Sequence, residues 1–72
     1  MKYSSKTASL RQARKLVFMY QDLDGDVEAW RVPFYSDIYT YELEGFETYA
    51  EARKAKGIEV RRIATLLQMG DW

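Results

Sequence analysis

The chain has no cysteine and no histidine, and only one proline and four glycines among its 72 residues. Without cysteine it forms no disulfide, and without both residue types it holds no Cys/His zinc site. The usual general base and the usual thiol nucleophile of enzymes are absent too, which argues against an enzyme. We therefore expect no catalytic residue, no metal and no cofactor. Stability must come from apolar packing or from a partner chain.

Long hydrophobic runs are also absent. The longest spans residues 16–20, which is far short of a membrane helix. No apolar run follows the basic N-terminus as a secretory signal requires. These features predict a cytoplasmic protein with a single domain over residues 1–72. Its hydrophobic content of 47% and aromatic content of 15% suffice for a folded core.

Acid is missing from the first 20 residues, and the charges of the whole sequence are segregated into three blocks, although the formal net charge is zero. Residues 1–20 contain five basic groups and no acid, residues 21–51 have a net charge of −8, and residues 52–72 have a net charge of +3. Any electrostatic function therefore depends on where the fold places these blocks.

Period-two alternation of apolar residues predicts an antiparallel β-meander of three strands. The strands are expected over about 15–22, 27–34 and 39–46. Asp24-Gly25 is a strong signal for the first reverse turn. Trp30, Val32 and Phe34 share one face of the second strand, which we expect a helix to cover.

One helix has clear start and stop signals. Thr48 and Glu51 have the spacing of a capping box, and Gly57 can take the left-handed conformation that ends a helix. We therefore expect a helix over 48–56 that packs on the sheet. A short N-terminal helix over 7–15 is also expected, with a frayed basic arm as the alternative.

Beyond Gly57 the pattern is ambiguous. Ile58 and Val60 alternate, which favours a final strand from residue 58, with a bulge near Arg61-Arg62 to restore the phase. The alternative is a helix that ends at Gly70, whose apolar face would carry Val60, Ile63, Ala64 and Leu67. We prefer the strand over 58–63 and leave residues 64–70 open. The predicted fold class is thus α+β, a small single domain.

Asp22, Asp24 and Asp26 have the spacing that opens a calcium-binding loop. Such a loop also needs glycine at its sixth position and glutamate at its twelfth, which here are Val27 and Pro33. We therefore interpret the segment as a hairpin turn.

The acidic middle of the chain is the first candidate for a binding surface. It is expected to bind a larger protein with a basic nucleic-acid-binding surface, with tyrosines as aromatic anchors. The bland alternative is a solvated outer face whose charges prevent aggregation. The candidate residues are Glu28, Tyr35, Asp37, Tyr39, Tyr41, Glu42 and Glu44.

The second candidate is a basic cluster that would bind nucleic acid directly. It consists of Arg53, Lys54, Lys56, Arg61 and Arg62. With Lys56-Gly57-Ile58 as a turn, this segment would form a helix-turn-helix with a recognition helix over 60–69. A third interpretation is a structural subunit of a homo-oligomer, which the small core favours.

Residues 32–36 (Val-Pro-Phe-Tyr-Ser), 47–52 (Glu-Thr-Tyr-Ala-Glu-Ala) and 57–63 (Gly-Ile-Glu-Val-Arg-Arg-Ile) resemble, in order and spacing, the small T7-type phage inhibitors of host RNA polymerase. The resemblance spans about half of the chain. It implies a compact α+β protein that blocks a host nucleic-acid machine, a polymerase or a nuclease-type defence complex, by protein contact. Host takeover or anti-defence would be its role.

Residues 10–13, 16–20, 31–33 and 58–63, together with Asp24-Gly25, are similar to the strand order and the arginine-containing last strand of WYL domains of bacterial regulators. This second resemblance implies a small barrel that senses nucleic acid or another ligand. It gives Arg62 a ligand-facing role.

Overall fold

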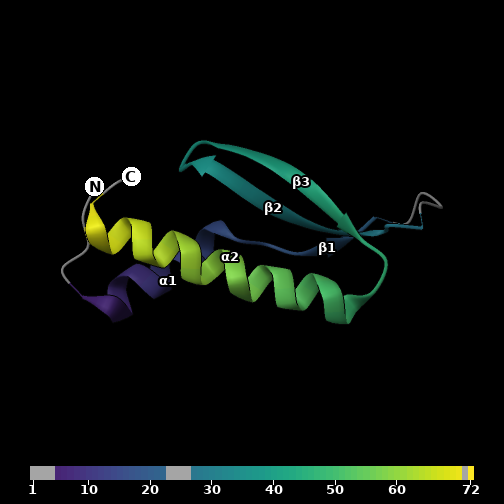
Figure 1. Cartoon of the computed structure of the whole chain (residues 1–72), viewed down its shortest axis with the longest axis horizontal. Helices are drawn as coiled ribbons and strands as arrows, with labels where there is room; N and C mark the ends of the chain where they lie inside the picture. Colours follow the sequence, from purple (N-terminus) through teal and green to yellow (C-terminus); the bar gives the residue numbers. More distant parts are fainter. Residues whose placement is uncertain (1–4, 23–26, 71) are drawn as a thin grey trace.

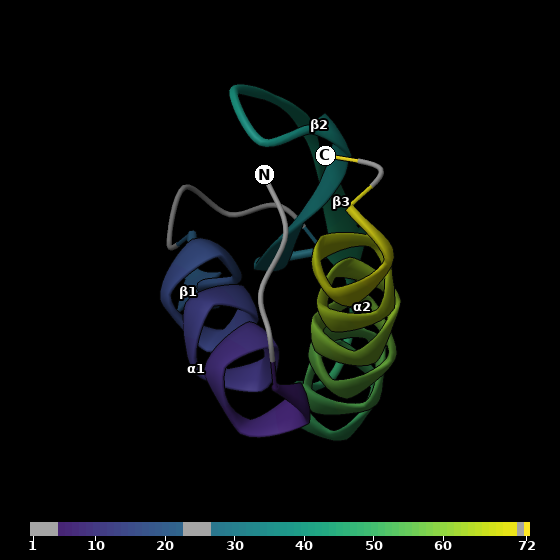
Figure 2. The ribbon, with the colours of Figure 1, turned by 90° about the vertical axis from the view of Figure 1, so that its left-hand side faces the viewer.

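The computed structural model describes residues 5–22, 27–70 and 72. The elements are α1 (Lys6–Leu16), β1 (Tyr20–Gln21), β2 (Trp30–Asp37), β3 (Thr40–Phe46) and α2 (Tyr49–Met69). The strands form one antiparallel sheet in the order β1-β2-β3, so the predicted α+β class and the meander are confirmed. α2 packs against β2 and β3, and α1 packs against α2. Figure 1 shows α2 running along the sheet, and Figure 2 shows the two helices side by side.

α1 is a capped helix and not a frayed arm. The hydroxyl oxygen of Ser5 accepts a hydrogen bond from the backbone N–H of Ala8 at 3.1 Å, which satisfies one of the free N–H groups of the first turn. Arg14 and Lys15 lie in the last turn, where the helix dipole favours positive charge. The helix therefore forms where the sequence predicts it.

α2 begins where the capping-box spacing predicts. Thr48 is the N-cap, and its hydroxyl accepts from the backbone N–H of Glu51 at 3.2 Å and donates to the Glu51 carboxylate at 2.9 Å. The helix ends at Gly70, which has φ 81° and whose N–H reaches the carbonyls of Leu66 and Leu67. A left-handed glycine at this position is a common helix end.

The predicted helix end at Gly57 is wrong. The final strand from residue 58 and the bulge near Arg61-Arg62 are wrong as well, because this whole segment is helical. A turn at residues 56–58 does not exist, so the segment is not a helix-turn-helix. The alternative that residues 60–69 form a helix is confirmed.

The helix continues through Gly57 because of the apolar stripe that follows it. Val60, Ile63 and Leu67 are all buried, on the face that the helical spacing predicts. A glycine inside a helix costs about 1 kcal/mol relative to alanine, whereas full burial of one leucine or isoleucine gains about 1.5–3 kcal/mol. Packing of this stripe therefore outweighs the local preference of glycine to end the helix.

The strands are shifted and shortened relative to the prediction. β1 has only two residues, because α1 takes the chain up to Leu16. β2 covers Trp30–Asp37, three residues later than expected, and β3 covers Thr40–Phe46. The predicted Asp24-Gly25 turn lies outside the described residues.

The core lies between α2, α1 and the sheet. Its buried apolar residues are Ala13, Val17, Val32, Tyr35, Ala52, Val60, Ile63, Ala64 and Leu67. Phe34 shares the α2 side of β2 with Val32, but its ring is 48% exposed. The helix therefore covers Phe34 only in part. The guanidinium of Arg62 lies over this ring, 4.3 Å from its centroid.

β2 has an open edge beyond its short pairing with β1. β1 reaches only as far as Arg31, so no strand among the described residues lies beside Pro33 and Tyr35 on that side. Pro33 has no N–H to leave unpaired, as expected for an edge position. Tyr35, in contrast, has both an N–H and a carbonyl that need partners.

Two side chains of α2 supply those partners. The Glu59 carboxylate accepts from the Tyr35 N–H at 2.7 Å, and Arg62 Nη2 donates to the Tyr35 carbonyl. Arg62 also binds Glu59 through both carboxylate oxygens, at 2.7 and 2.8 Å. The Glu59 side chain is only 5% exposed. The bond to Glu59 raises the pKa of Arg62, so the guanidinium stays charged. The Glu59–Arg62 pair thus takes the place of a neighbouring strand at Tyr35.

Removal of one partner should destabilise the protein strongly. Glu59→Ala leaves the Tyr35 N–H and the Arg62 guanidinium without their acceptor, and we expect a loss of about 2–3 kcal/mol. Glu59→Gln keeps one acceptor oxygen and should lose less. Glu42→Ala removes an exposed carboxylate and serves as the control, with an effect within about 0.5 kcal/mol. Urea unfolding of the three variants measures these differences. Equal stabilities of Glu59→Ala and Glu42→Ala would contradict the role of the pair.

The side chain of Tyr35 ties the sheet to the end of α1. Its hydroxyl donates to the carbonyl of Leu16, and the ring lies 5.0 Å from that of Tyr41. Burial raises the pKa of the Tyr35 hydroxyl above its ordinary value, and the nearby Tyr41 and Glu59 raise it further. The folded state therefore favours the neutral phenol.

This raised pKa predicts a loss of stability in alkali. The contribution of the neutral phenol is complete below the ordinary pKa of 10.0 and is lost as the pH rises through the higher pKa of the folded state. Tyr35→Phe should lose about 1 kcal/mol at neutral pH, from the missing hydrogen bond. The difference between the wild type and this variant should then shrink above pH 10. Denaturant unfolding as a function of pH tests this, and a difference that stays constant in alkali would contradict it.

Candidate functional site

The structure separates the residues of the predicted acidic and tyrosine-bearing surface. Tyr35 is 5% exposed, so its ring is part of the core and the expectation that it is a surface anchor is wrong. Asp37 and Tyr39 lie at the turn between β2 and β3, where the Asp37 carboxylate accepts from the Tyr39 N–H at 2.7 Å. Asp37 therefore holds the turn, while the Tyr39 ring is 86% exposed.

The remaining members lie on opposite faces of the sheet. Glu42 and Glu44 point to the α2 side of β3, and Tyr41 points to the other side, as the alternation of a strand requires. Glu28 lies beside Gly45 on the Tyr41 side, where an added Cβ on the glycine would come 3.0 Å from the Glu28 carboxylate. Glu42 and Glu44 are thus the only two of the predicted group that share one exposed face of a strand.

The basic cluster is also divided, because its members point to different sides of α2. Arg62 points to the sheet, where it binds Glu59 and the Tyr35 carbonyl. This contradicts both its predicted nucleic-acid contact and the ligand-facing role that the resemblance to WYL domains implies. The other four members, Arg53, Lys54, Lys56 and Arg61, line hollows on the side of α2 away from the sheet.

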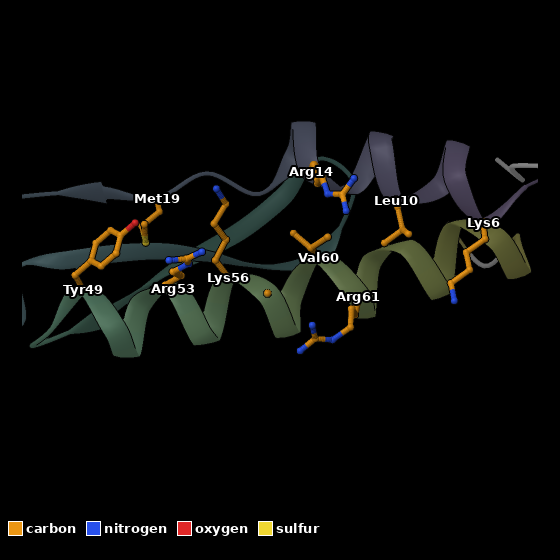
Figure 3. A pocket seen from close by; sticks show the side chains of 10 residues that line it. Lys6, Leu10, Arg14, Met19, Tyr49, Arg53, Lys56, Val60 and Arg61 are labelled. Atoms are coloured by element: carbon orange, nitrogen blue, oxygen red, sulfur yellow. The ribbon is translucent and has the colours of Figure 1, made fainter.

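The larger hollow is a groove between α1 and α2, and the smaller one lies on α2 alone and shares Tyr49, Arg53, Gly57 and Arg61 with it. We call the two together the basic groove. Its main part has a volume of about 710 Å³, and α1 contributes Lys6, Leu10 and Arg14 to it. Figure 3 shows five of its basic side chains, which come from both helices: Lys6, Arg14, Arg53, Lys56 and Arg61. The lining charges are Lys6, Arg14, Arg53, Lys54, Lys56 and Arg61. No acidic side chain is among the described residues that line the groove.

The two helices run antiparallel, which sets the charges in two rows. Lys6 lies near Arg61 and Gln68, whereas Met19, just after α1, lies near Tyr49 and Arg53. Lys6 and Arg14 are eight residues apart on α1, and Arg53 and Arg61 are eight apart on α2. At the rise of a helix each pair spans about 12 Å. The groove therefore carries positive charge along its length on both sides, from α1 and from α2.

The floor of the groove is apolar and open. Leu10, Met19 and Val60 contribute side chains to it, and Tyr49 lies at one end. Gly57 contributes no side chain, and an added Cβ there would meet only Arg61, at 3.7 Å. Glycine inside a helix lowers stability relative to alanine, but it leaves the backbone accessible to a ligand.

Sequence reasoning found four of the six cations and missed Lys6 and Arg14. Both belong to the basic block of residues 1–20. Arg14 lies in the expected helix 7–15, Lys6 lies just before it, and their spacing of eight residues was visible in the sequence. What the sequence does not contain is the pairing of α1 with α2, which depends on packing between segments more than 30 residues apart.

Other kinds of site find no support in the described part of the chain. Within residues 5–22, 27–70 and 72, no three acidic side chains converge as metal ligands would. Neither α1 nor α2 is long and apolar enough to span a bilayer. Comparison with protein-family models, curated proteins and solved structures found no match. Residues 58–63, which the resemblance to WYL domains places in the last strand, are helical.

Gly57 should be a site where stability can be gained. Alanine removes the conformational cost of glycine inside a helix and has room for its methyl group, so Gly57→Ala should stabilise the protein by about 0.5–1 kcal/mol. Gly70→Ala is the matched comparison, because Gly70 has φ 81° and alanine there is strained. Thermal unfolding of both variants measures the effect. A destabilised Gly57→Ala variant would show that the groove floor has no room.

Proposed function

We propose that the protein is a non-enzymatic nucleic-acid-binding protein that holds a phosphate backbone in the basic groove. The observation that carries this proposal is that two helices bring six cations to one groove whose described lining contains no acid. Phosphate contacts by lysine and arginine release condensed counterions, and this supplies most of the affinity in sequence-independent binding. Three of the six are arginines, which match phosphate oxygens with two parallel hydrogen bonds.

The shape of the groove favours a polymer with regularly spaced charges. Cations stand on both banks over about 12 Å of helix, so a strand that runs along the groove meets positive charge on either side. The apolar floor at Leu10, Met19 and Val60 suits sugar and base surfaces better than it suits carboxylates. Tyr49, 49% exposed, offers a ring on which a base can stack.

The expected inhibition of a nucleic-acid machine through one acidic and tyrosine-bearing surface has less support. Tyr35 is buried, and Tyr41 lies on the face of the sheet opposite Glu42 and Glu44. The part of that hypothesis that keeps a structural basis is β3 itself, which is a different surface from the basic groove.

Fluorescence anisotropy with a labelled single strand and a labelled duplex of about 20 nucleotides tests the proposal. Affinity should fall steeply between about 50 and 200 mM salt. Arg53→Gln/Arg61→Gln should weaken binding at every salt concentration and reduce the slope of log K against log salt by about 2. Arg11→Gln/Lys15→Gln removes the same charge from exposed positions of α1 that do not line the groove, and should change much less.

Three results would contradict the proposal. One is an affinity that does not depend on salt, and another is an equal loss in the two double variants. The third is displacement of the oligonucleotide by polyglutamate at equal charge concentration, because this would assign the groove to an acidic protein segment. Circular dichroism of each variant confirms that the fold is intact, so that a loss of binding reports the groove.

A further inference from the structure

β3 is an edge strand whose outer side is paired with nothing among the described residues. The hydrogen bonds of Tyr35 show which groups face that side. Because the N–H and carbonyl of Tyr35 point to Glu59 and Arg62, Tyr35 and its partner Tyr41 form a pair without mutual hydrogen bonds. The N–H and carbonyl groups of Tyr41 and Leu43 therefore point outward from the sheet.

The side chains along this edge alternate in character. Glu42 and Glu44 are exposed on one face, and Tyr41 and Leu43, each 45% exposed, lie on the other. Such a strand offers an added strand both a row of backbone hydrogen bonds and two different rows of side chains. The acidic row has no basic side chain opposite it on β2, where Phe34 and Val32 are the partners of Glu42 and Glu44.

We propose that the outer edge of β3 binds an extended segment of a partner protein in which lysine or arginine alternates with apolar residues. The basic residues would lie opposite Glu42 and Glu44, and the apolar residues would extend the row of Tyr41 and Leu43. Opposite charges on directly facing strand positions attract, and apolar pairs on the other face remove exposed surface from water. This site is independent of the basic groove, which lies between the helices.

A second copy of this chain is a poor occupant of the same edge. An antiparallel pair of β3 strands centred on Glu42, Leu43 or Glu44 sets a glutamate directly against a glutamate of the other copy. Like charges at facing positions destabilise strand pairing, and such charges on edges are a known device against self-association. The charge pattern therefore admits a basic partner and disfavours the protein itself.

The free edge of β2 at Tyr35, which we call the inner edge, differs from the outer edge of β3, and this contrast supports β3 as the binding edge. At Tyr35 the open edge of β2 is closed by the Glu59–Arg62 pair, with 2.7 Å between the N–H nitrogen and the carboxylate. On β3 no described side chain is recorded in a hydrogen bond to the backbone of Tyr41 or Leu43. Side chains of α2 thus close the free edge of β2 at Tyr35, whereas the outer edge of β3 is left open.

The test uses two labelled nine-residue peptides, one with alternating lysine and valine and one with alternating glutamate and valine. Fluorescence anisotropy should show binding of the lysine peptide and none of the glutamate peptide. Glu42→Lys/Glu44→Lys should weaken the lysine peptide about tenfold or more and should bind the glutamate peptide instead. Glu47→Lys reverses an acidic charge outside β3 without changing the Thr48–Glu51 cap, and it should not reverse the preference.

A lysine peptide with N-methylated valines separates strand addition from simple charge attraction. It keeps every charge but loses the N–H groups that would reach the outer edge of β3, so its binding should be abolished. Undiminished binding of this peptide would overturn the proposal, and so would failure of the unmethylated lysine peptide to bind, which would leave Glu42 and Glu44 as charges that only prevent aggregation. A wild-type dimer in light scattering that Glu42→Lys/Glu44→Lys alters would assign the edge to a second copy and overturn it too.

Discussion

The arrangement of this small protein depends on the hydrogen bonds between the Glu59–Arg62 pair and the backbone of Tyr35. The part of β2 beyond β1 and a helix have no regular way to share hydrogen bonds, and here one carboxylate and one guanidinium supply both an acceptor and a donor to the same residue. Because Glu59 is nearly fully buried, the charge of Arg62 is needed to keep it there. The pair fixes the rotation of α2 about its axis relative to β2.

That rotation decides what the rest of the surface offers. With Glu59 and Arg62 turned to the sheet, Arg53, Lys56 and Arg61 must lie on the other side of α2, where α1 adds its own cations. The acidic side chains of β3, Glu42 and Glu44, lie on the opposite side of α2 from this groove. A chain with no net charge thus acquires two surfaces of opposite sign, and each suits a different kind of partner.

Local signals in the sequence predicted the local structure well. The Thr48 cap, the N-terminal helix and the three-stranded meander are confirmed, because hydroxyl caps and period-two alternation act within a few residues. The helix end predicted at Gly57 was wrong, since the local preference of glycine to end a helix is outweighed by the free energy of burying Ile63 and Leu67 beyond it. The burial of Glu59 and the joining of Lys6 and Arg14 to the groove depend on contacts between distant segments, which no local pattern records. Arg62 was grouped with the other cations for the same reason.

Amide hydrogen exchange followed by NMR compares the two edges of the sheet in one experiment. The N–H of Tyr35, held by Glu59, should exchange about as slowly as amides of the core, such as that of Ile63. The N–H of Leu43, which points outward from β3, should exchange far faster although it lies in a longer stretch of regular strand. Fast exchange at Tyr35, or equal protection at Tyr35 and Leu43, would contradict the closed inner edge and the open outer edge on which both proposed surfaces depend.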